Sequence, residues 1–101
     1  SMPSAFWAAG SYDTNGVMLY QSGQVGCTVV HEATGIYFIE FDSPHPAGAN
    51  FIVSCEVFTA RAWGGFQVVA YEKNNASSFW LVVRNAGNTK SNGDCSFMVL
   101  A

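Results

Sequence analysis

Turn-forming residues divide this chain into segments that are each only long enough for one strand. The dividers are pairs such as Asn15-Gly16, Gly64-Gly65 and Asn92-Gly93, and they favour tight turns because Gly and Asn tolerate positive φ. The segments between them are rich in β-branched and aromatic residues and show no helical periodicity. We therefore predict eight strands, near residues 4–9, 16–21, 25–31, 35–42, 50–59, 66–73, 78–85 and 95–101.

Eight short strands at this spacing are typical of an all-β sandwich or barrel, and we predict an antiparallel β-sandwich of jelly-roll type. The 101 residues are enough for one domain and too few for a second, so residues 3–101 are assigned to a single domain. The pair Ser1-Met2 resembles a remnant of tag cleavage. It predicts that the domain has been excised from a longer protein.

Several strands carry apolar residues on both faces. Between Gly35 and Phe41, apolar side chains occupy both alternating sets of positions, and the same doubling recurs in 79–83 and 95–100. An antiparallel strand usually has one face in water. The pattern indicates that something covers both faces of these sheets, and no helix is predicted to do so.

The composition agrees with a covered second face. Hydrophobic residues make up 50% of the chain and charged residues 11%, against roughly 25% charged in an average soluble domain. A domain this small buries only about two-thirds of its unfolded surface, so apolar surface is left over. We predict that further copies of the same chain cover it. A closed barrel with scattered surface hydrophobes is the alternative that the sequence leaves open.

Charge and hydropathy exclude two classes of partner. Four Lys and Arg against seven Asp and Glu give a net charge of −3, and no basic run could neutralise phosphates, so nucleic acid is not expected as a partner. No apolar stretch approaches the ~20 residues that span a bilayer, so membrane insertion is not expected.

We interpret the cysteines as small hydrophobic residues rather than as a metal or redox site. Cys27, Cys55 and Cys95 are odd in number, lie within apolar segments and lack CxxC spacing. We predict that they are buried free thiols, as suits a reducing cytoplasm. One disulfide plus one free thiol is the alternative.

No motif for catalysis or metal binding is present. His31 and His45 form no HxH or HxxxH pair, and Cys27 would lie about 13 Å from His31 along one strand, too far for a nucleophile and its base. No GxSxG motif or glycine-rich phosphate loop occurs. We predict no catalytic residue, no metal and no cofactor, and we interpret Asp94, after Asn92-Gly93, as a turn cap.

Two loops are candidates for recognition, because loops on a rigid strand frame tolerate change. Residues 60–65 place Trp63 beside Arg61, an aromatic and cationic pair that suits sugars or protein hot spots. His45 lies between two prolines, and we predict that it is exposed in a stiff turn. The alternative for Trp63 is a lid folded over the end of the sandwich.

Two parts of the sequence resemble the C-terminal domains of viral fibre proteins, including phage tail fibres and fibre-like proteins of large algal viruses. The first is GIYFIEF at 35–41 followed by HPAGANFIV at 45–53, which is similar to "GxYxIxF, then P, then AN[YF]xV". The second is SFWLVVRNAG at 78–87 followed by DCSFMVL at 94–100, which is similar to "SFxVxxRxxxG…DxxFxFxV". Only part of the last alternation is kept. The resemblance covers residues 16–101.

The resemblance implies a non-enzymatic homotrimer at the distal end of a viral fibre or spike. Such a head sets the register of the shaft and contacts a host surface receptor, for which a glycan is one candidate. It would be located on the virion after assembly in the host cytoplasm. By carry-over, the trimer interface contains Trp80, Val82, Met98 and Leu100.

A related pattern of glycine and alternating aromatics gives the alternative of a secreted trimer similar to C1q or tumour necrosis factor. Free buried cysteines would favour the viral assignment. A disulfide and a glycan on the Asn75-Ala76-Ser77 sequon would favour the secreted one.

Overall fold

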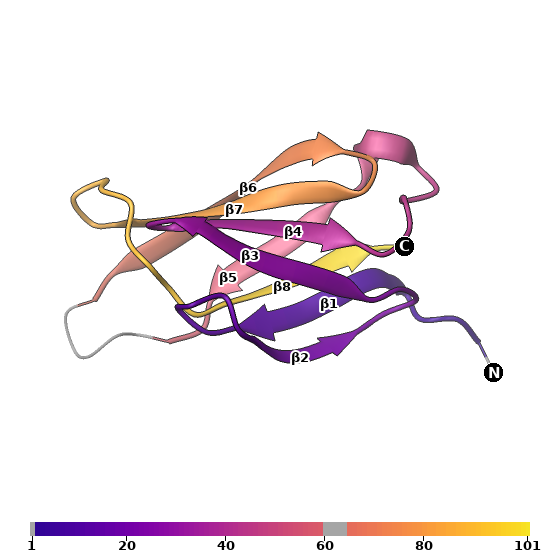
Figure 1. Cartoon of the computed structure of the whole chain (residues 1–101), viewed down its shortest axis with the longest axis horizontal. Coiled ribbons are helices and arrows are strands. Elements are labelled where there is room, and N and C mark those ends of the chain that lie inside the picture. Colours follow the sequence, from indigo (N-terminus) through magenta and orange to yellow (C-terminus); the bar gives the residue numbers. More distant parts are fainter. Residues whose placement is uncertain (1, 60–64) are drawn as a thin grey trace.

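Eight strands pair into two four-stranded antiparallel sheets in the computed structural model, which describes residues 2–59 and 65–101 (Figure 1). The predicted all-β sandwich is confirmed. The elements are β1 (Phe6–Tyr12), β2 (Met18–Ser22), β3 (Cys27–Ala33), β4 (Ile36–Phe41), the short 3-10 helix η1 (Gly48–Asn50), β5 (Val53–Val57), β6 (Gln67–Asn75), β7 (Ser78–Asn85) and β8 (Cys95–Leu100).

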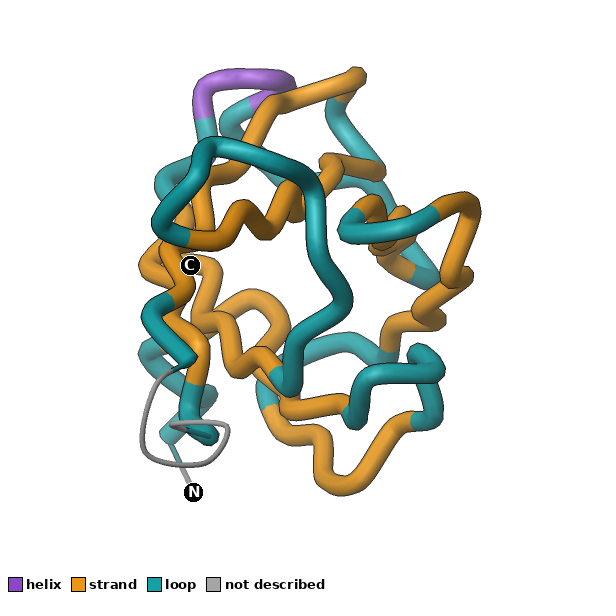
Figure 2. Tube along the Cα trace, turned by 90° about the vertical axis from the view of Figure 1, so that its left-hand side faces the viewer, coloured by secondary structure: helices purple, strands orange, loops and turns teal. Residues whose placement is uncertain are grey.

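The strand order within the sheets brings distant parts of the chain together. We call the sheet with order β2-β1-β8-β5 sheet A and the sheet with order β3-β4-β7-β6 sheet B. Only β1–β2, β3–β4 and β6–β7 are hairpins, and the other connections pass from one sheet to the other. Seen along the long axis in Figure 2, the strands surround the space that the inward side chains fill.

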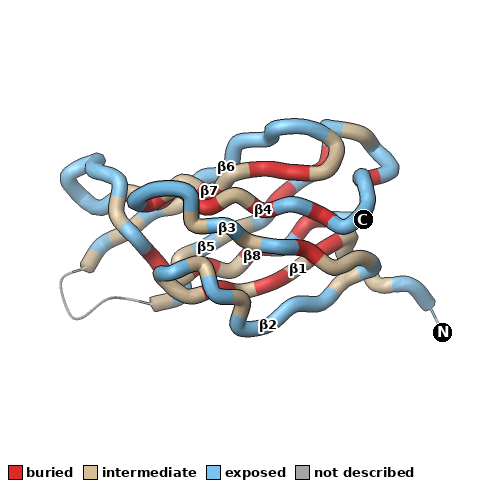
Figure 3. The backbone as a smooth tube through the Cα atoms, in the orientation of Figure 1, coloured by how far each residue is buried: buried red, intermediate tan, exposed pale blue. Residues whose placement is uncertain are grey.

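Aromatic side chains form the centre of the core. Phe79 of β7 is fully buried, and its ring lies 5.8 Å from that of Phe41 in sheet B and 5.7 Å from that of Phe97 in sheet A. Along β4, β7 and β8, buried residues alternate with less buried ones, as Figure 3 shows. One of the two apolar faces of each of these strands therefore fills the core, and the other faces outward.

The first strand differs from its prediction, because β1 extends to Tyr12 instead of ending near residue 9. Ala8, Gly10 and Tyr12 alternate inward and are buried. A Cβ atom on Gly10 would lie only 3.0 Å from the carbonyl oxygen of Tyr20 and 3.2 Å from the ring of Phe97. The glycine continues the strand because it lets the two neighbouring strands approach closely.

The β3–β4 hairpin depends on Gly35. Its φ is +71°, and a Cβ atom there would lie 2.7 Å from the carbonyl oxygen of Val83 and 2.9 Å from the amide nitrogen of Ser91. Gly48 has a similar φ of +64° but open space around its Cβ position. Substituting each of the two glycines therefore separates the energetic cost of a left-handed backbone from that of a steric clash.

We expect Gly35→Ala to lower the free energy of unfolding by about 3 kcal/mol or more, because a steric clash adds to the left-handed penalty. Gly48→Ala should lose only about 1 kcal/mol. Urea denaturation of both variants measures the difference. Equal losses would contradict the close packing described around Gly35.

Candidate functional site

His45 is not an exposed side chain, and that prediction is wrong. It is 7% exposed, its Nε2 donates to the carbonyl oxygen of Leu100 at 2.8 Å, and its Nδ1 accepts from the Ala47 amide at 3.0 Å. The ring also packs near Trp7 and Phe51, with centroids 5.5 and 5.7 Å away. Both ring nitrogens therefore form hydrogen bonds to the backbone of the domain, and His45 connects its loop to the last strand.

The other two recognition candidates, Arg61 and Trp63, lie outside the described residues. The assignment of both residues to receptor contact stays a prediction. The alternative, in which Trp63 is a lid, also stays a prediction.

The four residues predicted at one trimer interface lie on two different surfaces. Trp80 and Val82 point outward from sheet B, because their neighbours in β7 fill the core. Met98 and Leu100 point outward from sheet A for the same reason in β8. The four residues therefore do not share one face of the sandwich.

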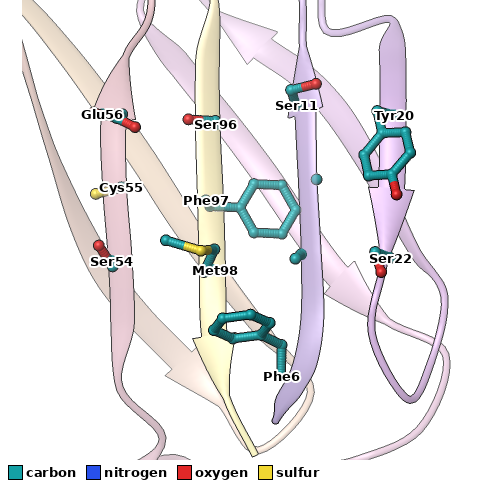
Figure 4. Close-up of a pocket in the computed structure, with 12 residues that line it drawn as sticks. Phe6, Ser11, Tyr20, Ser22, Ser54, Cys55, Glu56, Ser96, Phe97 and Met98 are labelled. Atoms are coloured by element: carbon teal, nitrogen blue, oxygen red, sulfur yellow. The ribbon is translucent and has the colours of Figure 1, made fainter. Parts of the chain in front are cut away.

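The outer face of sheet A is a shallow groove with small residues along its floor (Figure 4). The groove has a volume of about 370 Å³. One row across the sheet runs from Tyr20 through Ser11 and Ser96 to Glu56. Among the described residues of the lining, Glu56 alone is charged. The next row contains Ser22, Ala9, Met98 and Ser54.

The outer face of sheet B has larger apolar side chains and more charge. Val30, Phe38 and Trp80 lie side by side on three strands, and the rings of Phe38 and Trp80 are 5.5 Å apart. The Nε1 of Trp80 donates to the Glu32 carboxylate at 2.7 Å. This face therefore combines an aromatic centre with ionised groups.

The three cysteines are free, and two of them are buried as predicted. Cys27 and Cys95 are buried, whereas Cys55 on β5 is only half-buried. Burial raises the pKa of the Cys27 and Cys95 thiols to about 11, and it also raises the pKa of Cys55. Neutral, enclosed thiols are poor nucleophiles and poor metal ligands.

Asp94 and His31 both have structural contacts. The Oδ1 of Asp94 accepts from the Thr14 amide at 2.8 Å, so it binds the turn after β1, in keeping with its predicted capping role. The His31 ring stacks on Tyr37 at 4.5 Å, and its Nε2 lies 2.9 Å from the Oδ1 of Asn92. Within residues 2–59 and 65–101, no three His, Cys, Asp or Glu side chains are grouped to hold a metal ion.

Neither a family model, nor a curated protein, nor a solved structure matches this chain. In the described part of the chain, no helix is long and apolar enough to cross a membrane. The hollows on the two outer faces of the sandwich make those faces the candidate functional surfaces.

We expect His45→Ala to lower the free energy of unfolding by about 2–3 kcal/mol, because it removes a buried ring and leaves the Leu100 carbonyl without its donor. Ser43→Ala is the control, since Ser43 is exposed and contributes only its backbone oxygen to the bond from Trp7. Thermal and urea unfolding measure both. A His45→Ala variant as stable as the control would contradict the anchoring role.

The thiol pKa values predict a loss of stability in alkali. Folded Cys27 and Cys95 stay protonated up to about pH 11, whereas unfolded thiols ionise near 9.0, so stability should fall as the pH rises from 9 to 11. Urea midpoints at several pH values measure this fall, and it should be smaller in a Cys27→Ala/Cys95→Ala variant. At pH 8, iodoacetamide should modify Cys55 first. Equal rates at all three thiols would contradict the burial described.

Proposed function

We propose that this domain is a non-enzymatic trimerisation and attachment head from the C-terminal part of a viral fibre or spike protein, and that the copies meet through the outer face of sheet A. The observation that carries the proposal is the scarcity of charge on a broad sheet face that still exposes large apolar side chains.

The exposed side chains on sheet A support self-association. Leu100 is 50% exposed, Met98 42% and Tyr20 68%. Glu56 is the one charged side chain that lines the groove within residues 2–59 and 65–101. Interface cores are depleted of charge in this way, and contiguous exposed apolar surface is uncommon on monomers.

The groove itself suits a neighbouring copy. Its floor of Ala9, Ser11, Ser54 and Ser96 consists of short side chains, which leave room for residues from another subunit. In a trimer, each subunit would place an edge of its own sandwich in the groove of the next, which is the head-to-tail contact that closes a ring. Met98 and Leu100 are then interface residues, and Trp80 and Val82 are not.

The sequence resemblance supports the assignment to a viral fibre. The residues that carry it, 35–53 and 78–100, include both central strands of sheet B, β4 and β7, and one central strand of sheet A, β8. Within this proposal the sandwich is a jelly roll, the trimer sets the register of a shaft, and the head contacts a host surface receptor. The domain assembles in the host cytoplasm and is displayed on the virion.

One observation favours the secreted C1q-like or cytokine-like alternative. The sequon residue Asn75 is exposed in the β6–β7 hairpin, where its side-chain oxygen accepts from the Ser77 amide. The free thiols support the viral proposal instead. A glycan on Asn75 after expression through a secretory route, with function lost on its removal, would favour the alternative.

We expect the protein to have the mass of three chains by light scattering, and Met98→Glu/Leu100→Glu to have the mass of one chain. Val68→Glu is the matched control, because Val68 is 48% exposed on the outer face of sheet B. Circular dichroism checks that each variant is folded. A monomeric wild type, or a double variant that stays trimeric while folded, would refute the proposed interface.

A further inference from the structure

A second hollow lies on the outer face of sheet B, on the opposite side of the sandwich from the sheet A groove. Its volume is about 370 Å³. Val82 and Ile36, paired across β7 and β4, form its apolar floor, and Trp80 lies beside them. The hollow is therefore built on the central strands of a sheet, where backbone pairing fixes the positions of its residues.

Four ionised side chains surround this floor. Glu72 of β6 is paired with Trp80, and Glu32 of β3 receives the hydrogen bond from the Trp80 indole. On the other side are Arg84, which follows Val82 on the same face of β7, and Lys90, which is bridged to Arg84 through the backbone. The lining thus combines two acceptor groups, two donor groups and an aromatic ring.

These charges are available to a ligand. Among the described residues, no ion pair joins Glu32 or Glu72 to Arg84 or Lys90, and Arg84 makes only a long hydrogen bond of 3.5 Å to the Asn88 carbonyl. The described residues of the lining supply two carboxylates and two cations, which leaves them without net charge. A strongly anionic ligand would meet the carboxylates and a strongly cationic one the basic groups, so the balance favours a neutral ligand with many hydroxyls.

We propose that this hollow binds a pyranose ring of a neutral cell-surface saccharide. The C–H face of the sugar would lie against Trp80 and Val82, its hydroxyls would donate to Glu72 and Glu32, and Arg84 would donate to its oxygens. The proposal rests on the host-contact part of the proposed function and names its ligand class. It places recognition on the face that the proposed trimer leaves free, rather than on the loop with Arg61 and Trp63.

The test is nuclear magnetic resonance titration of the whole 101-residue protein with the methyl glycosides of galactose, glucose, mannose and N-acetylglucosamine. Sialic acid and trilysine serve as anionic and cationic probes. We expect at least one neutral glycoside to bind in the millimolar range and to shift the Trp80 indole signal most strongly. That signal is assigned by comparison with Trp80→Phe.

Glu72→Gln tests the acceptor role without removing bulk. Loss of a charge-assisted hydrogen bond should weaken binding about tenfold. Glu40→Gln is the matched control, since Glu40 is an exposed carboxylate on the same outer face and lies outside the hollow. The Glu40→Gln variant should bind the glycoside with the same affinity as the wild type.

The proposal is overturned by any of three results: no neutral glycoside shifts the Trp80 signal at saturating concentration, Glu72→Gln binds as tightly as Glu40→Gln, or sialic acid or trilysine binds more tightly than every neutral glycoside. Light scattering on the same samples separates this failure from that of the proposed function. A trimer without sugar binding refutes only the saccharide site, and a monomer that binds sugar refutes only the sheet A interface.

Discussion

The fold depends on the contact between the two sheets at Phe79. Its ring, fully buried on β7, meets Phe41 within its own sheet and Phe97 in the other, and Phe51 lies 5.9 Å away beside η1. Since side chains alternate along a strand, an inward Phe79 fixes Trp80 as an outward residue. A slip of one residue would exchange the two faces of β7, and the buried aromatic contacts prevent it.

The same alternation gives the sandwich two outer faces of different chemistry. Sheet A presents short side chains, hydroxyls and a few exposed apolar residues. Sheet B presents Trp80 and Phe38 with carboxylates and cations nearby. A surface almost without charge suits permanent contact with another copy of the chain. An aromatic surface bordered by both acidic and basic side chains suits reversible, selective binding of a ligand. The proposals assign one function to each face accordingly.

The sequence predicts the local features well and the non-local ones poorly. The strands at 36–41 and 78–85 follow from apolar alternation and their flanking turns, and their ends lie within about one residue of the predicted bounds. The burial of His45 does not follow from its local sequence, because it depends on Leu100, which is distant in sequence. Membership of a sheet is equally non-local, so Trp80 and Met98 could be recognised as outward residues but not as residues of opposite faces.

In sheet A the first strand pairs with the last, and this strand order affects when the chains can begin to associate. β8 lies between β1 and β5, so that Phe6 pairs with Leu100 and the sheet closes only when almost the whole chain has come together. Contacts of such long sequence separation form slowly, on a scale of about milliseconds to seconds in all-β domains. The face that carries Met98 and Leu100 does not exist before that step. Association through it would therefore follow the folding of each chain, and its kinetics would show a concentration-independent lag.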